Sequence, residues 1–122
     1  MTKGARKFGV VQWTSETDER LAAPGEKSRL LEHRVNGRVA LLVGADGSFQ
    51  RVRIGDQEFR ISAEKIAPAE GTKYAVGDEL ILDGKPTKVK EVVWHYAKNQ
   101  PFYLLDIDGK KSSKRYFNDD LK

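Results

Sequence analysis

Apolar and polar residues alternate along much of the chain with a period of two. Val52 and Ile54 alternate with Arg51 and Arg53, and a similar alternation recurs over residues 57–62 and 103–107. This period indicates β-strands with one buried face. The segment 27–35 stays ambiguous, and elsewhere the pattern predicts eight strands, over residues 8–14, 38–44, 49–55, 57–62, 79–83, 87–97, 102–108 and 112–117.

Short turn signals separate these segments. Gly supplies positive φ, and Asp and Asn tolerate left-handed conformations, so pairs of these residues close hairpins. Such pairs occur, among other places, at Asn36-Gly37, Gly55-Asp56, Asp83-Gly84 and Asp108-Gly109. Their spacing, mostly about 8 to 12 residues, is typical of a small all-β barrel or sandwich.

A helix is expected, if anywhere, between Thr14 and His33. Residues 15–18 supply side-chain oxygens that suit an N-cap. The pair Pro24-Gly25 would end such a helix after about two turns. A loop over the same residues is therefore an equal alternative.

The chain also contains an internal repeat. A shift of 53 positions places residues 43–54 on residues 96–107 without a gap, with Phe49 on Phe102 and Ile54 on Ile107. Each half has a strand, a polar turn, a strand that begins with an aromatic residue, a hairpin, a short strand and a turn ending in an aliphatic residue. Shared spacing of this kind indicates repeated supersecondary units. Coincidence among short hairpins is the alternative.

The second half resembles a small SH3-like barrel of the broad KOW/Tudor type. The resemblance covers residues 74–121: a strand that begins after Val76-Gly77-Asp78, long bent hairpins, and one tight helical turn before the last aliphatic residue, Leu121. A weaker echo covers residues 27–68, where the Gly-Asp start is missing. Members of this class mostly bind nucleic acids, proteins or modified side chains, so the resemblance implies binding and no particular activity.

This resemblance and the repeat together predict an all-β fold of two tandem SH3-like barrels. The first repeat is expected over residues 27–69 and the second over 74–122. An N-terminal arm, residues 1–26, precedes them, and its strand Phe8–Trp13 is expected to dock onto one barrel. A single merged β-barrel is the structural alternative.

Composition narrows the functional classes. The 122 residues suit one ordinary domain or two very small ones, and 22 basic against 18 acidic residues give a net charge of +4. That charge permits a polyanionic partner. The absence of Cys excludes disulfides, thiolate zinc sites and thiol nucleophiles. No apolar stretch approaches the roughly 20 residues of a membrane span, and no export signal is recognisable, so a cytoplasmic location and no membrane partner are expected.

Catalytic motifs are lacking. The two histidines, His33 and His95, lie far apart in the sequence, and no nucleophile elbow, phosphate loop or dinucleotide fingerprint occurs. Asp106-x-Asp108 suits a hairpin better than a cation site, and Asp119-Asp120 suits a capped turn. We therefore expect a non-catalytic protein with no cofactor and no metal.

Aromatic residues gather near the C-terminal end: six of the eleven lie between residues 94 and 117. Neighbours on a strand face opposite sides. One of Phe102 and Tyr103, and one of Tyr116 and Phe117, must therefore point away from the barrel interior. The alternative is that a further layer, the other repeat or the N-terminal strand, covers the outward rings.

A basic run, residues 110–115, adjoins these aromatic residues. Exposed rings beside cations suit single-stranded nucleic acid, because rings stack bases and cations meet phosphates. The alternative is a solvated hairpin tip neutralised by Asp106, Asp108, Asp119 and Asp120. The sequence predicts a nucleic-acid or partner-binding site formed by Trp94, Tyr96, Phe102, Tyr116, Lys110, Lys111, Lys114 and Arg115.

The predicted function is thus a non-catalytic binding module that contacts nucleic acid through a basic hairpin and exposed aromatic rings. The alternative is a protein-binding adaptor or inhibitor, of an immunity or regulatory type, that uses the aromatic patch as its interface. Exposed strand edges would also allow it to recruit a partner strand.

Overall fold

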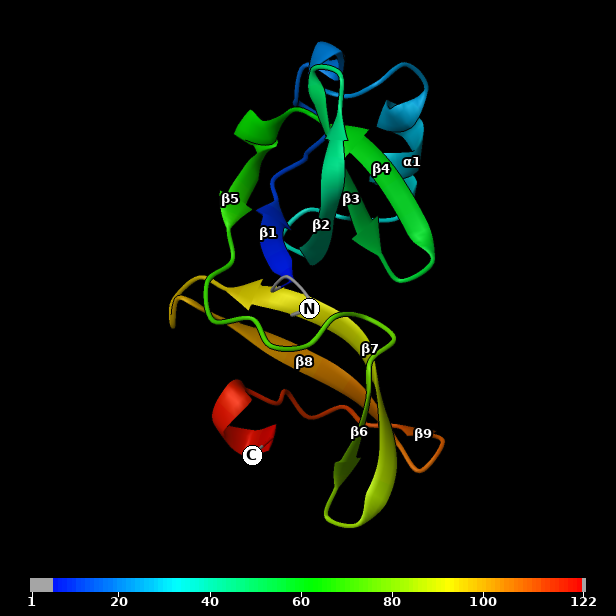
Figure 1. Ribbon diagram of the computed structural model, residues 1–122, viewed down its shortest axis with the longest axis vertical. Helices are drawn as coiled ribbons and strands as arrows, with labels where there is room; N and C mark the ends of the chain where they lie inside the picture. Colours follow the sequence, from blue (N-terminus) through cyan, green and yellow to red (C-terminus); the bar gives the residue numbers. More distant parts are fainter. Residues whose placement is uncertain (1–5, 122) are drawn as a thin grey trace, which may run out of the picture.

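The computed structural model describes residues 6–121 and is mostly β, with two antiparallel sheets and one short helix (Figure 1). Residues 1–5 of the predicted arm, and Lys122, lie outside the described residues. The helix α1 spans Glu26–Glu32, and three 3₁₀ turns occur at η1 (Glu19–Leu21), η2 (Ala63–Lys65) and η3 (Asn118–Leu121). The strands are β1 (Lys7–Val11), β2 (Val39–Asp46), β3 (Phe49–Ile54), β4 (Gln57–Ile61), β5 (Ile66–Pro68), β6 (Glu79–Leu82), β7 (Lys85–His95), β8 (Gln100–Ile107) and β9 (Lys110–Lys111).

The first sheet has the strand order β4-β3-β2-β1-β5. The strand predicted in the N-terminal arm is confirmed as β1, and it is an inner strand, because Val10 pairs with Val39 of β2 on one side and with Ala67 of β5 on the other. Gly9 makes this close approach possible. A Cβ atom there would overlap the Ile66 Cγ2 atom and lie 3.3 Å from the Ala67 carbonyl oxygen.

The second sheet has the strand order β6-β7-β8-β9. Asp83 and Gly84, with φ of 51° and 77°, form the two-residue turn between β6 and β7, as hairpin geometry favours. Neither sheet closes into a barrel, so the prediction of closed barrels, tandem or merged, is wrong on this point. Short edge strands account for the open sheets: β5 ends at Pro68, which has no N–H to extend the pairing, and β9 has only two residues.

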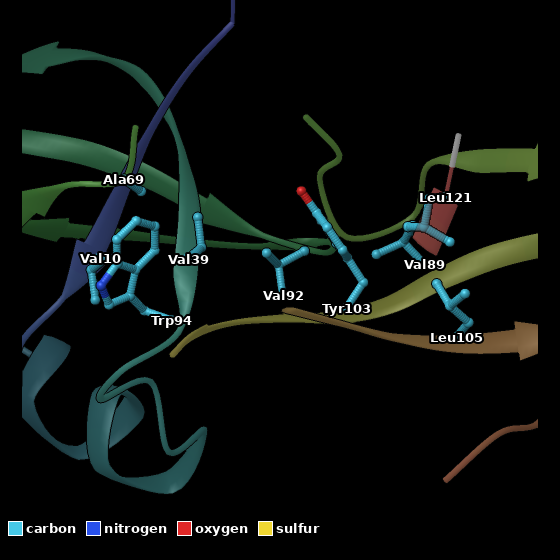
Figure 2. Close-up of a cluster of buried hydrophobic side chains, with 9 residues drawn as sticks. All are labelled: Val10, Val39, Ala69, Val89, Val92, Trp94, Tyr103, Leu105 and Leu121. Carbon is cyan, nitrogen blue, oxygen red and sulfur yellow. The ribbon is translucent and has the colours of Figure 1, made fainter. Parts of the chain in front are cut away.

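Two hydrophobic cores lie on opposite sides of the first sheet. Val10 of β1 faces the core between the two sheets, which Figure 2 shows, while the neighbouring Val11 faces the core beneath α1. Successive strand residues point to opposite faces. β1 is therefore buried on both faces and joins the two halves of the molecule.

The helix begins where the sequence was expected to end one. Gly25 adopts a left-handed conformation (φ 85°) immediately before α1, so Pro24-Gly25 introduces the helix. The buried carboxylate of Glu26 accepts hydrogen bonds from the Arg29 guanidinium (2.6 Å) and the Arg60 backbone N–H (2.7 Å). These bonds tie the first turn of α1 to β4.

Seven of the eight predicted strands are confirmed within a few residues at each end, and the eighth is wrong. The segment predicted as a strand over residues 112–117 pairs with β8 at a single bridge, between Tyr103 and Tyr116. β5 and β9 were not predicted. No helix within residues 6–121 is both long enough and apolar enough to cross a membrane.

The buried Tyr103 hydroxyl connects three parts of the second half. It accepts a hydrogen bond from the Lys73 N–H (3.0 Å) and donates one to the Asn118 Oδ1 atom (2.7 Å). Asn118 in turn donates to the Gly71 carbonyl oxygen (2.6 Å). β8, η3 and the segment that joins the two sheets are thereby held together.

Gly9→Ala should destabilise the protein, because the added methyl group has no room between β1 and β5. Forced overpacking of this kind costs about 1–3 kcal/mol. Urea unfolding of both proteins measures the difference, with Lys7→Ala, on the same strand and exposed, as control. Equal midpoints for Gly9→Ala and wild type would contradict the packing described for β1.

Tyr103→Phe should lower the free energy of unfolding by about 1–3 kcal/mol, because the Lys73 N–H and the Asn118 Oδ1 atom lose their partner in a buried site. The matched control is Tyr96→Phe, whose hydroxyl is exposed and for which a change within about 0.5 kcal/mol is expected. Thermal or urea unfolding distinguishes the two. A Tyr103→Phe variant as stable as the control would refute the role of this hydroxyl.

Acid should weaken the link between Arg6 and Asp78. Partial burial alone would raise the pKa of Asp78, but the Arg6 hydrogen bonds (2.8 and 3.0 Å), the Ala75 N–H and the Arg6 charge lower it below 3.8. The carboxylate therefore contributes its full stability above pH 3.8, and this is lost as the pH falls through the lower folded pKa. Asp78→Asn should cost about 1 kcal/mol at pH 7. In urea unfolding from pH 7 to 2, a difference from wild type that does not shrink would contradict this assignment.

Candidate nucleic-acid interface

Strand alternation sorts the paired aromatic residues onto two faces of the second sheet. The bridge between Tyr103 and Tyr116 places both of these rings on the side of the core. Their neighbours Phe102 and Phe117 therefore share the opposite side, with ring centroids 6.2 Å apart. We call this opposite side the outer face. The prediction that one member of each pair points away from the interior is confirmed.

Trp94 does not belong to the exposed site. It is 9% exposed and packs in the core between the sheets, near Val10 and Val39 (Figure 2). The backbone N–H of Trp94 also donates to the Gly37 carbonyl oxygen (2.9 Å), which holds β7 against the first sheet. The prediction of an exposed ring here is wrong, because Trp94 falls on the inner side of β7.

Phe102 is also unavailable, although it lies on the outer face. It is 8% exposed, because His95, Phe117 and Arg115 surround it. The Arg115 guanidinium lies 4.7 Å from the centre of the Phe102 ring. A further layer thus covers this ring, which corrects its predicted role as a stacking surface for bases.

The aromatic rings of this region hold cations. The Lys98 ammonium lies 4.4 Å from the centre of the Phe117 ring, and the Lys114 ammonium lies 5.0 Å from that of Tyr116. Together with the Arg115 contact, these cation–π interactions contribute about 0.5–1 kcal/mol each at exposed sites. The rings therefore fix where the positive charges lie, whereas the sequence analysis expected them to face a ligand themselves.

Five cations of the second half, which we together call the cation row, are Lys98, Lys110, Lys111, Lys114 and Arg115. No carboxylate within residues 6–121 forms an ion pair with any of them. Asp106, expected to neutralise the basic run, is paired with Lys90 instead (3.5 Å). Asp120 accepts a hydrogen bond from the Phe117 N–H. In the first sheet Arg53 and Arg60 have carboxylate partners, whereas Lys7 and Arg51 form no ion pair within residues 6–121.

The cation row follows β8 along its length. Lys98 lies just before β8, and Lys110 and Lys111 form β9 just after it. The chain then runs back beside β8, as Figure 1 shows, with hydrogen bonds from Ser112 to Leu105 and between Tyr116 and Tyr103. An eight-residue strand covers about 23 Å at 3.3 Å per residue. The row is thus extended, and between its two ends Lys114 lies over the core-side ring of Tyr116 while Arg115 lies over the outer-face ring of Phe102, on opposite sides of the segment.

Tyr96 is the one predicted ring that stays well exposed, at 62%, in the turn between β7 and β8. Within this turn the His95 Nδ1 atom accepts a hydrogen bond from the Lys98 N–H (3.1 Å), and Asn99 adopts a positive φ of 51°. Tyr96 and Lys98 are thereby held in one short turn. A ring face and a cation lie together at this end of the row.

His95 and Phe117 were absent from the predicted site, yet they position it. His95 lies edge-on to Phe102 and to Phe117, with ring centroids 6.2 and 5.6 Å apart. The position of Phe117 could have been predicted: side chains alternate along residues 115–117, so Phe117 falls on the outer face with Phe102 once Tyr116 faces the core. The cover formed by His95 depends on the turn geometry, which sequence periodicity does not reveal.

The described part of the chain contains no evident metal centre. No group of three or more His, Asp or Glu side chains between residues 6 and 121 is placed to hold a metal ion. His33 packs edge-on against Phe59, with ring centroids 5.6 Å apart, and His95 packs against the outer-face rings.

Comparison with known proteins gives a family and no function. The sequence model of one family, described as a family of unknown function (DUF6960), matches residues 1–122. Searches of curated proteins and of solved structures found no match.

Proposed function

The chain belongs to the family of unknown function DUF6960, and we propose that it is a non-catalytic module that binds nucleic acid through the cation row. One observation carries the proposal: five cations without a carboxylate partner in residues 6–121 follow a single strand for about 23 Å. Cations that are held by rings and left unpaired by carboxylates are available to an external polyanion.

A linear row of single charges matches a phosphate backbone better than it matches base edges. Phosphate contacts bind without reading sequence, and each one releases a counterion, so the affinity falls as salt rises. Tyr96 adds one exposed ring at the end of the row, where a base of a single strand would stack. The proposed ligand is therefore nucleic acid of any sequence, with single strands favoured.

We also propose that each sheet, with the 3₁₀ turn near its C-terminal end (η2 or η3), is an SH3-like unit left open at one side. β-bulges bend the hairpins β2–β3 and β7–β8. The turn η2 precedes Ile66, and η3 ends on the buried Leu121. These features support the tandem reading without a closed barrel.

Charge reversal tests the proposed interface. The double variant Lys111→Glu/Lys114→Glu should bind a fluorescent single-stranded oligonucleotide at least about tenfold more weakly at 0.1 M salt, because two of about five phosphate contacts are lost. In the wild type, the slope of log K against log salt should be near −3.5, at about −0.7 for each contact.

The matched control is Lys7→Glu/Arg34→Glu, which changes two exposed residues outside the row and gives the same net charge, 0 in place of +4. Its affinity should stay within about threefold of wild type. Equal losses in both double variants would show that net charge alone acts. Binding that is absent, or insensitive to salt, would refute the proposed function.

A further inference from the structure

Three of the four sheet edges in residues 6–121 are protected against pairing with another strand, and the fourth, β6, is not. Residues 21–23 cover β4, with hydrogen bonds from Ser62 to Leu21 (2.6 Å) and from Ala23 to Arg60 (3.0 Å). β5 has three residues and ends in proline, and β9 consists of two lysines. Short length, proline and lysine are the usual protections of an edge. β6 reads Glu-Leu-Ile-Leu, and its Ile81 is 69% exposed.

Comparison of the two sheets shows what the β6 edge lacks. In the first sheet β1 lies between β2 and β5, and β5 follows the turn η2. In the second sheet β6 holds the place of β1 and β7 that of β2, but no strand in residues 6–121 holds the place of β5. Within residues 6–121, no strand therefore pairs with the outer edge of β6.

The backbone of β6 is oriented to pair at this edge. Ile81 lies opposite Pro86, which has no N–H, so this pair exchanges no hydrogen bonds across the hairpin. Along an antiparallel hairpin, hydrogen-bonded and non-bonded residue pairs alternate. Leu80 and Thr87 are therefore a bonded pair, and Glu79 and Lys88 are the next non-bonded one. The N–H and C=O groups of Glu79 and Ile81 therefore point away from β7 toward the open side.

Two grooves border β6 and indicate which side chains a partner strand would carry. One, of about 490 Å³, presents Ile81 and Pro86 beside Lys88 and three carboxylates: Asp106, which is paired with Lys90, and Glu79 and Asp108, which form no ion pair within residues 6–121. The other, of about 390 Å³, presents Leu82, Ile107 and Tyr116 with balanced charges. The first groove therefore favours basic side chains, and the second favours apolar ones.

A second copy of β6 fits this edge poorly. Antiparallel pairing of two β6 strands through their outward groups sets Glu79 against Glu79, Ile81 or Asp83 of the other copy, depending on the register, and Glu-Leu-Ile-Leu supplies no cation to the acidic groove in any of them. Like charges across a strand pair are destabilising. Charge complementarity instead favours a strand with lysine or arginine.

We propose that β6 binds an extended segment of a partner protein as an added antiparallel strand, and that apolar and basic residues alternate in this segment. The segment occupies the place that β5 holds in the first sheet. Main-chain hydrogen bonds to Glu79 and Ile81 supply affinity, and the two grooves supply specificity. The second groove shares Lys114 with the cation row. The main-chain hydrogen bonds to β6 do not involve this residue, so the proposal does not depend on the function of the row.

A capped peptide of about seven residues that alternates lysine and valine serves as the probe. Its binding to the full chain is measured by titration calorimetry, with a valine–glutamate peptide of equal length as the control ligand. We expect the basic peptide to bind, the acidic one to bind at least about tenfold more weakly, and Ile81→Pro to weaken the basic peptide about tenfold. Proline removes only an outward N–H there, a position that edge strands tolerate.

Ile81→Thr is the matched variant, because it keeps the N–H and a β-branched side chain, and it should bind within about threefold of wild type. If Ile81→Pro does not fold, the peptide is changed instead of the protein. A peptide whose backbone N–H groups facing β6 are N-methylated should then no longer bind to the wild-type protein. Equal losses for the proline and threonine variants, no binding of the basic peptide, or a wild-type dimer that Ile81→Pro abolishes would each overturn the proposal.

Discussion

The inward position of Tyr103 is the constraint on which the rest of the second half depends. Its side chain is completely buried, and burial raises the pKa of its phenol, so the hydroxyl stays protonated and donates to Asn118. A strand residue that is fixed on one face fixes its neighbours on the other. Because Tyr103 faces the core, Phe102 must face outward, and the bridged residue Tyr116 sends Arg115 and Phe117 to the same side.

The distribution of charge follows from this register. Phe102 and Phe117 on the outer face become supports for Arg115 and Lys98, while the carboxylate at Asp106 is occupied by Lys90. Positive charges are thus left available along β8. The same sheet keeps an unprotected edge at β6, some distance along the chain from the basic run. The second half therefore offers two surfaces that meet at Lys114, one proposed for a polyanion and one for a partner strand.

Much of this arrangement was predictable from sequence, because strands with one buried face have a clear period. The strands β1 to β4 and β6 to β8 were located, and so was the rule that one ring of each adjacent pair faces outward. The outcome at Trp94 and Phe102 was not predictable, since it depends on which segments cover each face. The start of α1 was missed because the left-handed Gly25 introduces a helix that Pro24 was expected to end.

The prediction that the sheets close into barrels was wrong for a related reason. Turn spacing predicts hairpins, but closure depends on whether the outermost strands are long enough to meet, and β5 and β9 have only three and two residues. The similarity between the two halves was visible in the sequence as a shared spacing of strands and turns. It did not reveal that, within residues 6–121, β6 has no counterpart of β5 beside it.

A nuclear magnetic resonance titration of the full chain with a short single-stranded oligonucleotide tests the central claim most directly. The account predicts that the largest backbone shifts fall on residues 96–98 and 110–115 and fade as salt is added. Shifts that concentrate on the first sheet, or spectra that the oligonucleotide leaves unchanged at low salt, would contradict it.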